Sequence, residues 1–126
     1  MTRFLYLIFI NFIVQPNLII MKEIRYLATG LLLLTGVLHF VPLITNFSGE
    51  HSLPMAAFGI VYLGVAYLLY KNRAIGKFLG VLMPLVGMGA AVIQIGIPNW
   101  DLLLKVMVGI DVVVVVCCIL LLNKRR

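Results

Sequence analysis

Four polar side chains capable of chemistry lie inside long apolar stretches of this 126-residue sequence: His39, Gln94, Lys105 and Asp111. A polar group in such a setting is costly, so each one needs a hydrogen-bond partner or a function. Asp111 is the most informative, because it lies near the middle of its stretch and must be partnered or protonated there. Three roles stay open for it: a proton or cation site, a polar contact to a cofactor, or a structural hydrogen bond between helices.

His39 lies near the end of its apolar stretch and could act as a haem ligand, a quinone contact or a proton relay. A haem held by two histidines needs a second histidine inside the same domain, and the other histidine, His51, falls in a polar connector. The sequence therefore disfavours a bis-histidine haem. An ordinary hydrogen bond from His39 to a neighbouring group is the alternative.

Other motifs that carry chemistry are missing from the sequence. Cys117 and Cys118 are adjacent, so they match neither a redox Cys-x-x-Cys motif nor the spacing of zinc ligands. There is no Gly-rich phosphate loop, no Gly-x-Ser-x-Gly elbow and no His-Glu-x-x-His motif. We therefore predict no metal site, no cofactor is evident from the residues, and classical hydrolase or nucleotide chemistry is disfavoured.

The composition is that of a membrane protein. Hydrophobic residues make up 63% of the chain and charged residues 11%, against about 25% charged in an ordinary soluble domain. So few charges cannot cover a small soluble fold, and the hydrophobicity excludes intrinsic disorder. The net charge of +6 comes from basic residues between apolar stretches. It therefore predicts a lipid bilayer, and not a nucleic acid, as the partner.

Four apolar stretches are long enough to cross a bilayer as helices, which takes roughly 20 residues each. None alternates apolar and polar residues as a membrane strand does. Short connectors containing Gly, Pro or Asn separate the stretches, so that consecutive helices run antiparallel. We therefore predict an all-α, up-down four-helix transmembrane bundle over residues 21–126, with spans at about 24–44, 53–70, 78–97 and 102–122.

Basic residues alternate along the connectors and predict the orientation of the bundle. All those near the predicted helix ends fall before the first span, between the second and third spans, or after the fourth. The other two connectors contain none. Because Lys and Arg favour the cytoplasmic side, we expect both ends of the bundle to be cytoplasmic (N-in/C-in) and the protein to lie in the cell membrane. The residues are Lys22, Arg25, Lys71, Arg73, Lys77, Lys124, Arg125 and Arg126.

Residues 1–20 fit this pattern less well. The apolar stretch Phe4–Val14 is too short to span, and the residues Gln15–Asn17 predict a break after it. Three interpretations stay open: a short interfacial segment, part of a fifth span, or an extension upstream of a true start at Met21. The sequence from Met21 to Arg25 resembles a cytoplasmic beginning before a first span and slightly favours the last of these.

A stripe of small residues runs along the third span. Gly76, Gly80, Gly87 and Ala91 share one helical face with Gln94. Small residues let helices approach closely, so we predict that this face packs against another helix. A groove for a ligand is the alternative interpretation of this face, and another membrane protein or a second copy of the chain stays open as a partner.

The stretch Thr35–Pro42 (TGVLHFVP) resembles the end of the first helix in the DoxX-like family of small four-helix membrane proteins. The match rests on Gly36, His39, Phe40 and Pro42, together with the four-span layout over residues 21–126. A Glu that many of those relatives carry in the second helix has no counterpart here. The resemblance implies a membrane subunit associated with redox systems, with quinone as the cofactor it suggests.

Three functions therefore stay open on the sequence alone. The first is an accessory, redox-associated membrane subunit. The second is a small proton-coupled transporter or permeation pathway using Asp111, and the third is a structural assembly partner. If all four polar residues face inward, His39, Gln94 and Lys105 lie near one end of the bundle and Asp111 about 9 Å deeper. We expect such a polar funnel to admit a quinone head group, a small ligand or a proton.

Overall fold

The computed structural model describes residues 1–45, 50 and 52–124, with the side chains of 9–17 outside the description. This part of the chain contains helices and no strand. Four helices in it are long and apolar enough to cross a bilayer, as predicted. The elements are α1 (Thr2–Leu38), α2 (Val41–Thr45), α3 (Ser52–Tyr70), α4 (Ala74–Gln94), the 3-10 turn η1 (Ile97–Asn99) and α5 (Leu102–Asn123).

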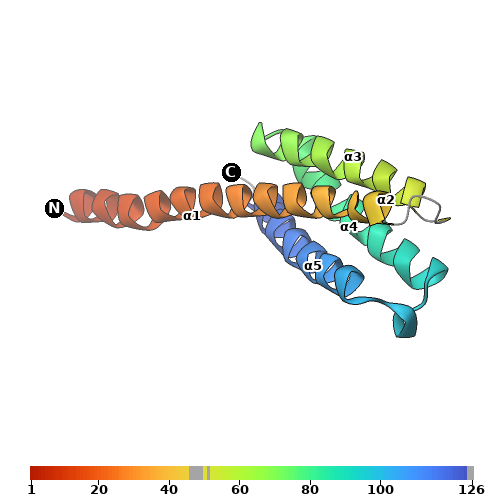
Figure 1. Cartoon of the computed structure of the whole chain (residues 1–126). Coiled ribbons are helices and arrows are strands. Elements are labelled where there is room, and N and C mark those ends of the chain that lie inside the picture. Colours follow the sequence, from red (N-terminus) through yellow and green to blue (C-terminus); the bar gives the residue numbers. More distant parts are fainter. Residues whose placement is uncertain (46–49, 51, 125–126) are drawn as a thin grey trace.

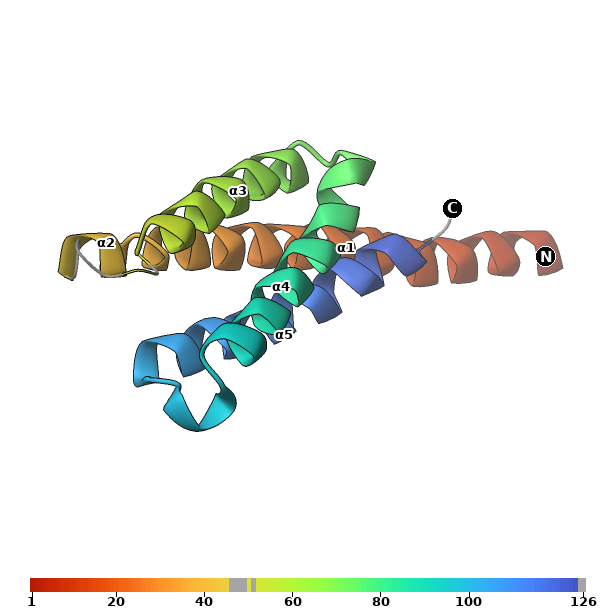
Figure 2. The ribbon, with the colours of Figure 1, turned by 90° about the vertical axis from the view of Figure 1, so that its right-hand side faces the viewer.

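The four long helices form a ring in which each packs against two others. α1 packs against α3 and α5, and α4 packs against the same two helices from the other side. α5 lies close to α1 near the C-terminus and diverges from it toward η1, as Figures 1 and 2 show. α3 and α5 therefore face each other across the centre of the bundle, which is where a site shared by all four helices lies.

Three close contacts between small residues fix how the helices cross. On α1 and α3, Gly36 and Gly59 meet so closely that a Cβ added at Gly59 would lie 2.8 Å from the Gly36 carbonyl oxygen. On α4 and α5, a Cβ added at Gly80 would lie 2.5 Å from Cys118 Sγ. Gly76 lies against the backbone between Leu68 and Leu69 of the preceding helix, which closes the α3–α4 turn. Such contacts need the absence of a side chain.

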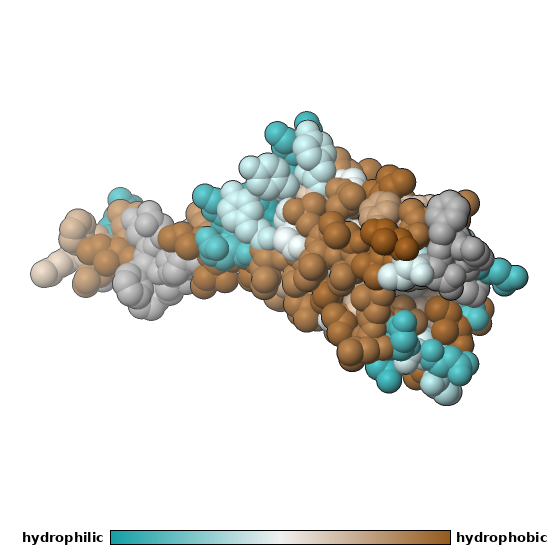
Figure 3. Space-filling view, viewed as in Figure 1, coloured by the Kyte–Doolittle hydropathy of each residue, from teal (hydrophilic) through white to brown (hydrophobic). Residues whose placement is uncertain are grey.

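The outer surface of the bundle is apolar. The fully buried core is small and centres on side chains such as Leu32, Tyr62 and Val114, whereas Ile93 is 85% exposed and Leu53 is 70% exposed. Figure 3 shows a brown apolar band between two teal hydrophilic zones, one around the middle of α1 and one around the α4–α5 connection. An exposed apolar surface of this extent, together with four helices long and apolar enough to cross a bilayer, suggests a multi-pass membrane protein.

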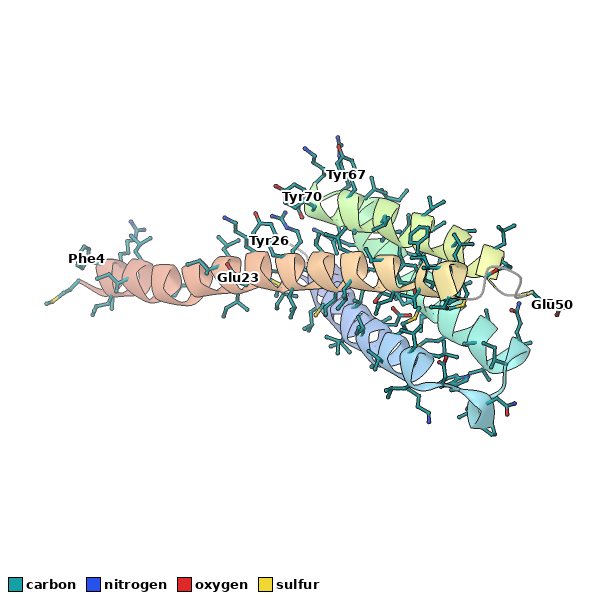
Figure 4. The ribbon with its side chains drawn as sticks, in the orientation of Figure 1. Phe4, Glu23, Tyr26, Glu50, Tyr67 and Tyr70 are labelled. Atoms are coloured by element: carbon teal, nitrogen blue, oxygen red, sulfur yellow. The ribbon has the colours of Figure 1, made fainter. Side chains whose placement is uncertain are left out.

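The first helix differs from its predicted bounds at both ends. It runs without interruption through residues 15–17, where the apolar stretch Phe4–Val14 ends. A proline inside a helix removes one hydrogen bond at a cost of about 3 kcal/mol, and a long helix tolerates this. At 37 residues, α1 is about 55 Å long, and its N-terminal part, with Phe4, extends past the bundle (Figures 1 and 4).

At its other end, α1 stops at Leu38, before the predicted end at Ile44, and the short α2 follows. Pro42 explains this, because it cannot donate a hydrogen bond to the Leu38 carbonyl and its ring clashes with that carbonyl. The helix therefore turns at His39 and Phe40. This turn brings the only histidine of the described residues to the end of a long helix.

Candidate functional site

Asp111 lies at the centre of the bundle and is 4% exposed. It is the tenth residue of the 22-residue α5, about 14 Å from the start of that helix and so near its middle. The hydroxyl of Tyr62 on α3, a side chain with no exposed surface, donates a 2.8 Å hydrogen bond to Asp111 Oδ2. The second carboxyl oxygen, Oδ1, is buried and has no hydrogen-bond partner among the described residues. The carboxyl group is therefore held on one side and free on the other.

His39 lies beside this pair. Its ring centroid is 4.8 Å from that of Tyr62, and Nδ1 lies 2.7 Å from the Thr35 carbonyl oxygen. A carbonyl oxygen only accepts hydrogen bonds, so Nδ1 carries the proton that is donated to it. Nε2 is then the ring nitrogen left to exchange a proton. The turn after Leu38 and the Gly36–Gly59 contact together position this ring.

A cavity of about 80 Å³ connects these groups. His39, Gln94 and Asp111 contribute polar groups to its wall, and the remaining lining residues are apolar, Pro or Gly, including Phe58 and Met107. A water molecule needs roughly 10–15 Å³ of such space and two to four polar partners, so about five waters fit. The cavity therefore brings polar groups of His39, Gln94 and Asp111 to one otherwise apolar space, although Oδ1 of Asp111 itself has almost no accessible surface.

The cavity lies toward the end of the bundle that carries α2 and η1. A second cavity, of about 150 Å³, adjoins it and shares Met55 and Leu104 in its wall. This outer cavity is lined by polar residues of the η1 region, Asn99 and Asp101. Side chains from the two helix-connecting regions therefore form an entrance, and Asp111 lies at its inner end.

Lys105 does not belong to this site, which corrects the predicted funnel of four residues. It is exposed and lines none of the cavities described here. Six residues separate it from Asp111, which turns it about 120° away on the helix, whereas Leu104 is seven residues away and faces the cavity. A pairing of Lys105 with Asp101, which the spacing of four allows, is also not formed. Asp101 instead caps α5 by accepting a 2.8 Å hydrogen bond from the Leu104 amide.

The small-residue stripe of α4 has two roles in the structure. Gly76 and Gly80 make the helix contacts described above. Gly87 lies against the site, because a Cβ added there would be 3.2 Å from the Tyr62 hydroxyl. Ala91 and Gln94 line the cavity, and Gln94 is the exposed one of the two. The stripe is thus used inside this chain, first for packing and then as a wall of the cavity.

Tyr62 is a site residue that was not predicted from the sequence. It resembled the tyrosines that commonly lie at the ends of membrane helices, such as Tyr67 and Tyr70 on the same helix. Those two are exposed, and Tyr62 is not. A signal was present, because Tyr62 shares a face with the small or apolar residues Gly59, Ala66 and Leu69, all of them buried. A tyrosine on a buried face needs a partner for its hydroxyl.

Metal and quinone chemistry find little support in this geometry. The described residues contain no group of three or more His, Cys, Asp or Glu side chains placed to hold a metal ion. His51 lies outside the described residues. The cavity that Asp111 lines, of about 80 Å³, is smaller than an apolar cavity of about 150 Å³ that binds benzene, so a quinone ring would need space from the adjoining cavity as well. The cavity beside Asp111 alone has room for water or a very small solute.

No known protein family, no curated protein and no solved structure matches this chain significantly. The resemblance to the DoxX-like family therefore stays a prediction from a short motif and the four-span layout. The function is therefore inferred from the geometry of the site.

Proposed function

We propose that the chain is a multi-pass membrane protein that passes protons at Asp111, as a small proton-coupled transporter or permeation pathway. One observation carries this proposal: a buried carboxyl group in the middle of an apolar helix has one oxygen bonded to Tyr62 and the other unpaired beside a cavity. Ionisable residues inside a membrane are costly and mark proton or ion pathways. A structural role alone would not need the unpaired oxygen.

The surrounding groups suit proton movement. The Tyr62 hydroxyl stabilises one oxygen of the carboxyl, and the cavity that Asp111 lines has room for waters. His39 borders the same cavity and has Nε2 available, so it extends the chain of exchangeable groups toward the entrance. Gln94 supplies a neutral amide at the outer part of the wall.

Access to the site is one-sided in this structure. Beyond Asp111, the described core is closed by apolar side chains, including Leu32, Leu69, Val114 and Leu121. A proton taken up at Asp111 therefore leaves by the same route unless the helices rearrange. Transport would require a second state in which the α1–α3 and α4–α5 pairs shift and expose Asp111 to the other end.

The orientation belongs to the same proposal. The basic residues used to predict the orientation lie at the end of the bundle opposite the cavity entrance: Lys22, Arg25, Lys71, Arg73, Lys77 and Lys124. Arg125 and Arg126 lie outside the described residues. By the positive-inside rule that end faces the cytoplasm of the cell, and the entrance opens on the other side of the cell membrane. Protons would then reach Asp111 from outside the cell.

The other two functions from the sequence lack a supporting observation in the described residues. For an accessory redox-associated subunit, the cavity would have to widen to hold a quinone ring. For a structural assembly partner, the α4 stripe would have to face outward, and Gly76, Gly80 and Gly87 instead face α3 or α5.

Proton uptake by vesicles containing the purified protein tests the proposal. A potassium gradient with valinomycin sets a membrane potential, and an enclosed pH-sensitive dye reports entry of protons. We expect uptake with the wild type and none with Asp111→Asn, which keeps the shape of the side chain and removes its charge.

Glu23→Gln is the control, because it removes the charge of an exposed acidic residue on α1 that lines neither the cavity beside Asp111 nor the outer cavity. This control should take up protons at the wild-type rate. Equal uptake by wild type and Asp111→Asn would reject the proposal, as would the absence of uptake by the wild type.

A further inference from the structure

A third cavity, of about 310 Å³, lies at the end of the bundle opposite the entrance to the Asp111 site. Its wall comes from α1, from the region between α3 and α4, and from the end of α5. Its volume is at the lower end of the range for cavities that hold small molecules, about 300–1,000 Å³. Four basic side chains line it: Lys22, Arg25, Lys77 and Lys124.

These four cations lack an anionic partner in the described part of the chain. No acidic residue lines the cavity, and Glu23, the nearest acidic residue in the sequence, is exposed on α1. The Nε atom of Arg25 is buried and makes no hydrogen bond to any described residue. Four like charges around one space repel each other, and an anion bound between them would relieve this repulsion.

Aromatic contacts hold two of the cations in place. Lys22 Nζ lies 5.8 Å and Arg25 Cζ lies 5.2 Å from the centroid of the Tyr26 ring. Tyr26 in turn contacts Tyr70 at the end of α3, with ring centroids 6.2 Å apart. Figure 4 labels both tyrosines. Cation–π contacts of this kind reduce the freedom of long basic side chains and orient them before a ligand arrives.

The remaining wall of the cavity is partly apolar. Leu18, Met21 and Leu121 line it together with the basic residues, and Asn72 adds an amide. A free phosphate ion gains nothing from apolar contacts, whereas a lipid carries its phosphate group next to hydrocarbon chains that can contact apolar side chains. This mixed basic and apolar lining favours a ligand that is itself part of the membrane.

We propose that this cavity binds the phosphate-bearing head group of an anionic membrane lipid. The guanidinium of Arg25 and the ammonium groups of Lys22, Lys77 and Lys124 bind the phosphate oxygens, since charge-assisted hydrogen bonds are the strong ones. The apolar residues contact the start of the acyl chains. Basic cavities between membrane helices at the cytoplasmic face recognise head groups in this way. The site is independent of Asp111 and does not rest on the proton pathway.

Thermal unfolding of the full chain in mild detergent tests this inference. Three probes are added separately: short-chain phosphatidylglycerol, short-chain phosphatidylcholine and inorganic phosphate. We expect phosphatidylglycerol alone to raise the unfolding midpoint. Lys77→Gln and Arg25→Gln should each require at least about tenfold more phosphatidylglycerol for the same rise, as expected for a lost charge-assisted hydrogen bond.

Two variants with the same loss of charge serve as controls. Lys71→Gln and Arg73→Gln change exposed basic residues at the same end of the bundle that do not line the cavity, so they should respond like the wild type. An equal loss of affinity for phosphatidylglycerol in the cavity variants and the control variants would overturn the inference, because the general positive charge of the surface would then explain binding. An equal rise with phosphatidylcholine, an equal rise with inorganic phosphate, or no rise with any probe would overturn it too.

Discussion

The hydroxyl of Tyr62 and the carboxyl group of Asp111 are joined by a 2.8 Å hydrogen bond between residues 49 positions apart. The bond crosses the centre of the bundle, because α3 and α5 each pack mainly against α1 and α4. Within the apolar core this hydrogen bond fixes the position of α3 relative to α5, and it also holds one oxygen of the Asp111 carboxyl group. Stability and the proposed proton pathway therefore depend on the same pair.

Replacing Tyr62 by Phe should destabilise the protein. The change keeps the ring but leaves Asp111 Oδ2 buried without its donor, which typically costs about 1–3 kcal/mol. Reversible unfolding in mixed detergent micelles measures this loss. Tyr67→Phe on the same helix is the control, since Tyr67 is 61% exposed and its variant should unfold like the wild type.

A double-mutant cycle separates the bond from the ring. If the bond is responsible, Tyr62→Phe should cost clearly less in an Asp111→Leu background than in the wild type, because the carboxyl oxygen is no longer there to be left unpaired. Equal costs in the two backgrounds would show that the hydroxyl of Tyr62 contributes through other contacts.

Gly80 should not tolerate a large side chain. A Cβ there already meets Cys118 Sγ on α5, so Gly80→Leu should overpack the α4–α5 contact and cost typically about 1–3 kcal/mol. Gly89→Leu is the matched control, because a Cβ at Gly89 meets nothing within 4 Å. Thermal unfolding in detergent compares the two variants. Equal midpoints would mean that α4 and α5 are not packed through Gly80.

The N-terminal part of α1 should be dispensable for the bundle. Described side chains near the N-terminus are exposed, such as Phe4 at 70% and Leu5 at 61%, and Figure 4 shows Phe4 beyond the other helices. A chain that begins at Met21 should therefore unfold at the same temperature as the full chain and insert in the same orientation. Degradation or altered orientation of the shorter chain would show that residues 1–20 are part of the fold.

The orientation of the bundle is testable by labelling in cells. With Cys117 and Cys118 replaced by Ala, a single cysteine is placed at Lys71 in one variant and at Asn99 in another. An impermeant thiol reagent added outside should label the Asn99 variant and leave the Lys71 variant unlabelled until the cells are opened. Labelling of the Lys71 variant in intact cells would reverse the proposed orientation.

The layout of the four spans was predictable from sequence because it depends on the length and apolarity of continuous stretches. The bounds of α3 and α5 differ from the predicted ones by one residue at most. α4 begins and ends earlier than predicted. Gly96, with φ at 78°, and Pro98 stop it after Gln94, although the residues remain apolar to Ile97.

The candidate site was predictable only in part. A polar residue in an apolar stretch is visible from composition, which is how Asp111, His39 and Gln94 were selected. The partner of Asp111 was not visible, because the pairing with Tyr62 depends on which helices face each other across the ring. Lys105 was predicted to lie in the site because it is close to Asp111 in sequence and polar. The part of α5 that lines the cavity is narrower than predicted, and it contains Leu104 and Val108 but not Lys105.

The most direct measurement of the central claim is the infrared absorbance of the Asp111 carboxyl group in bilayers as the pH of the bath changes. We predict a carboxylic-acid C=O band that appears and disappears with pH in the wild type and in Glu23→Gln. The same band should shift in frequency in Tyr62→Phe, which removes the hydrogen bond, and should be missing from Asp111→Asn. A spectrum of Asp111→Asn identical to that of the wild type at every pH would contradict the claim that Asp111 exchanges protons through the cavity.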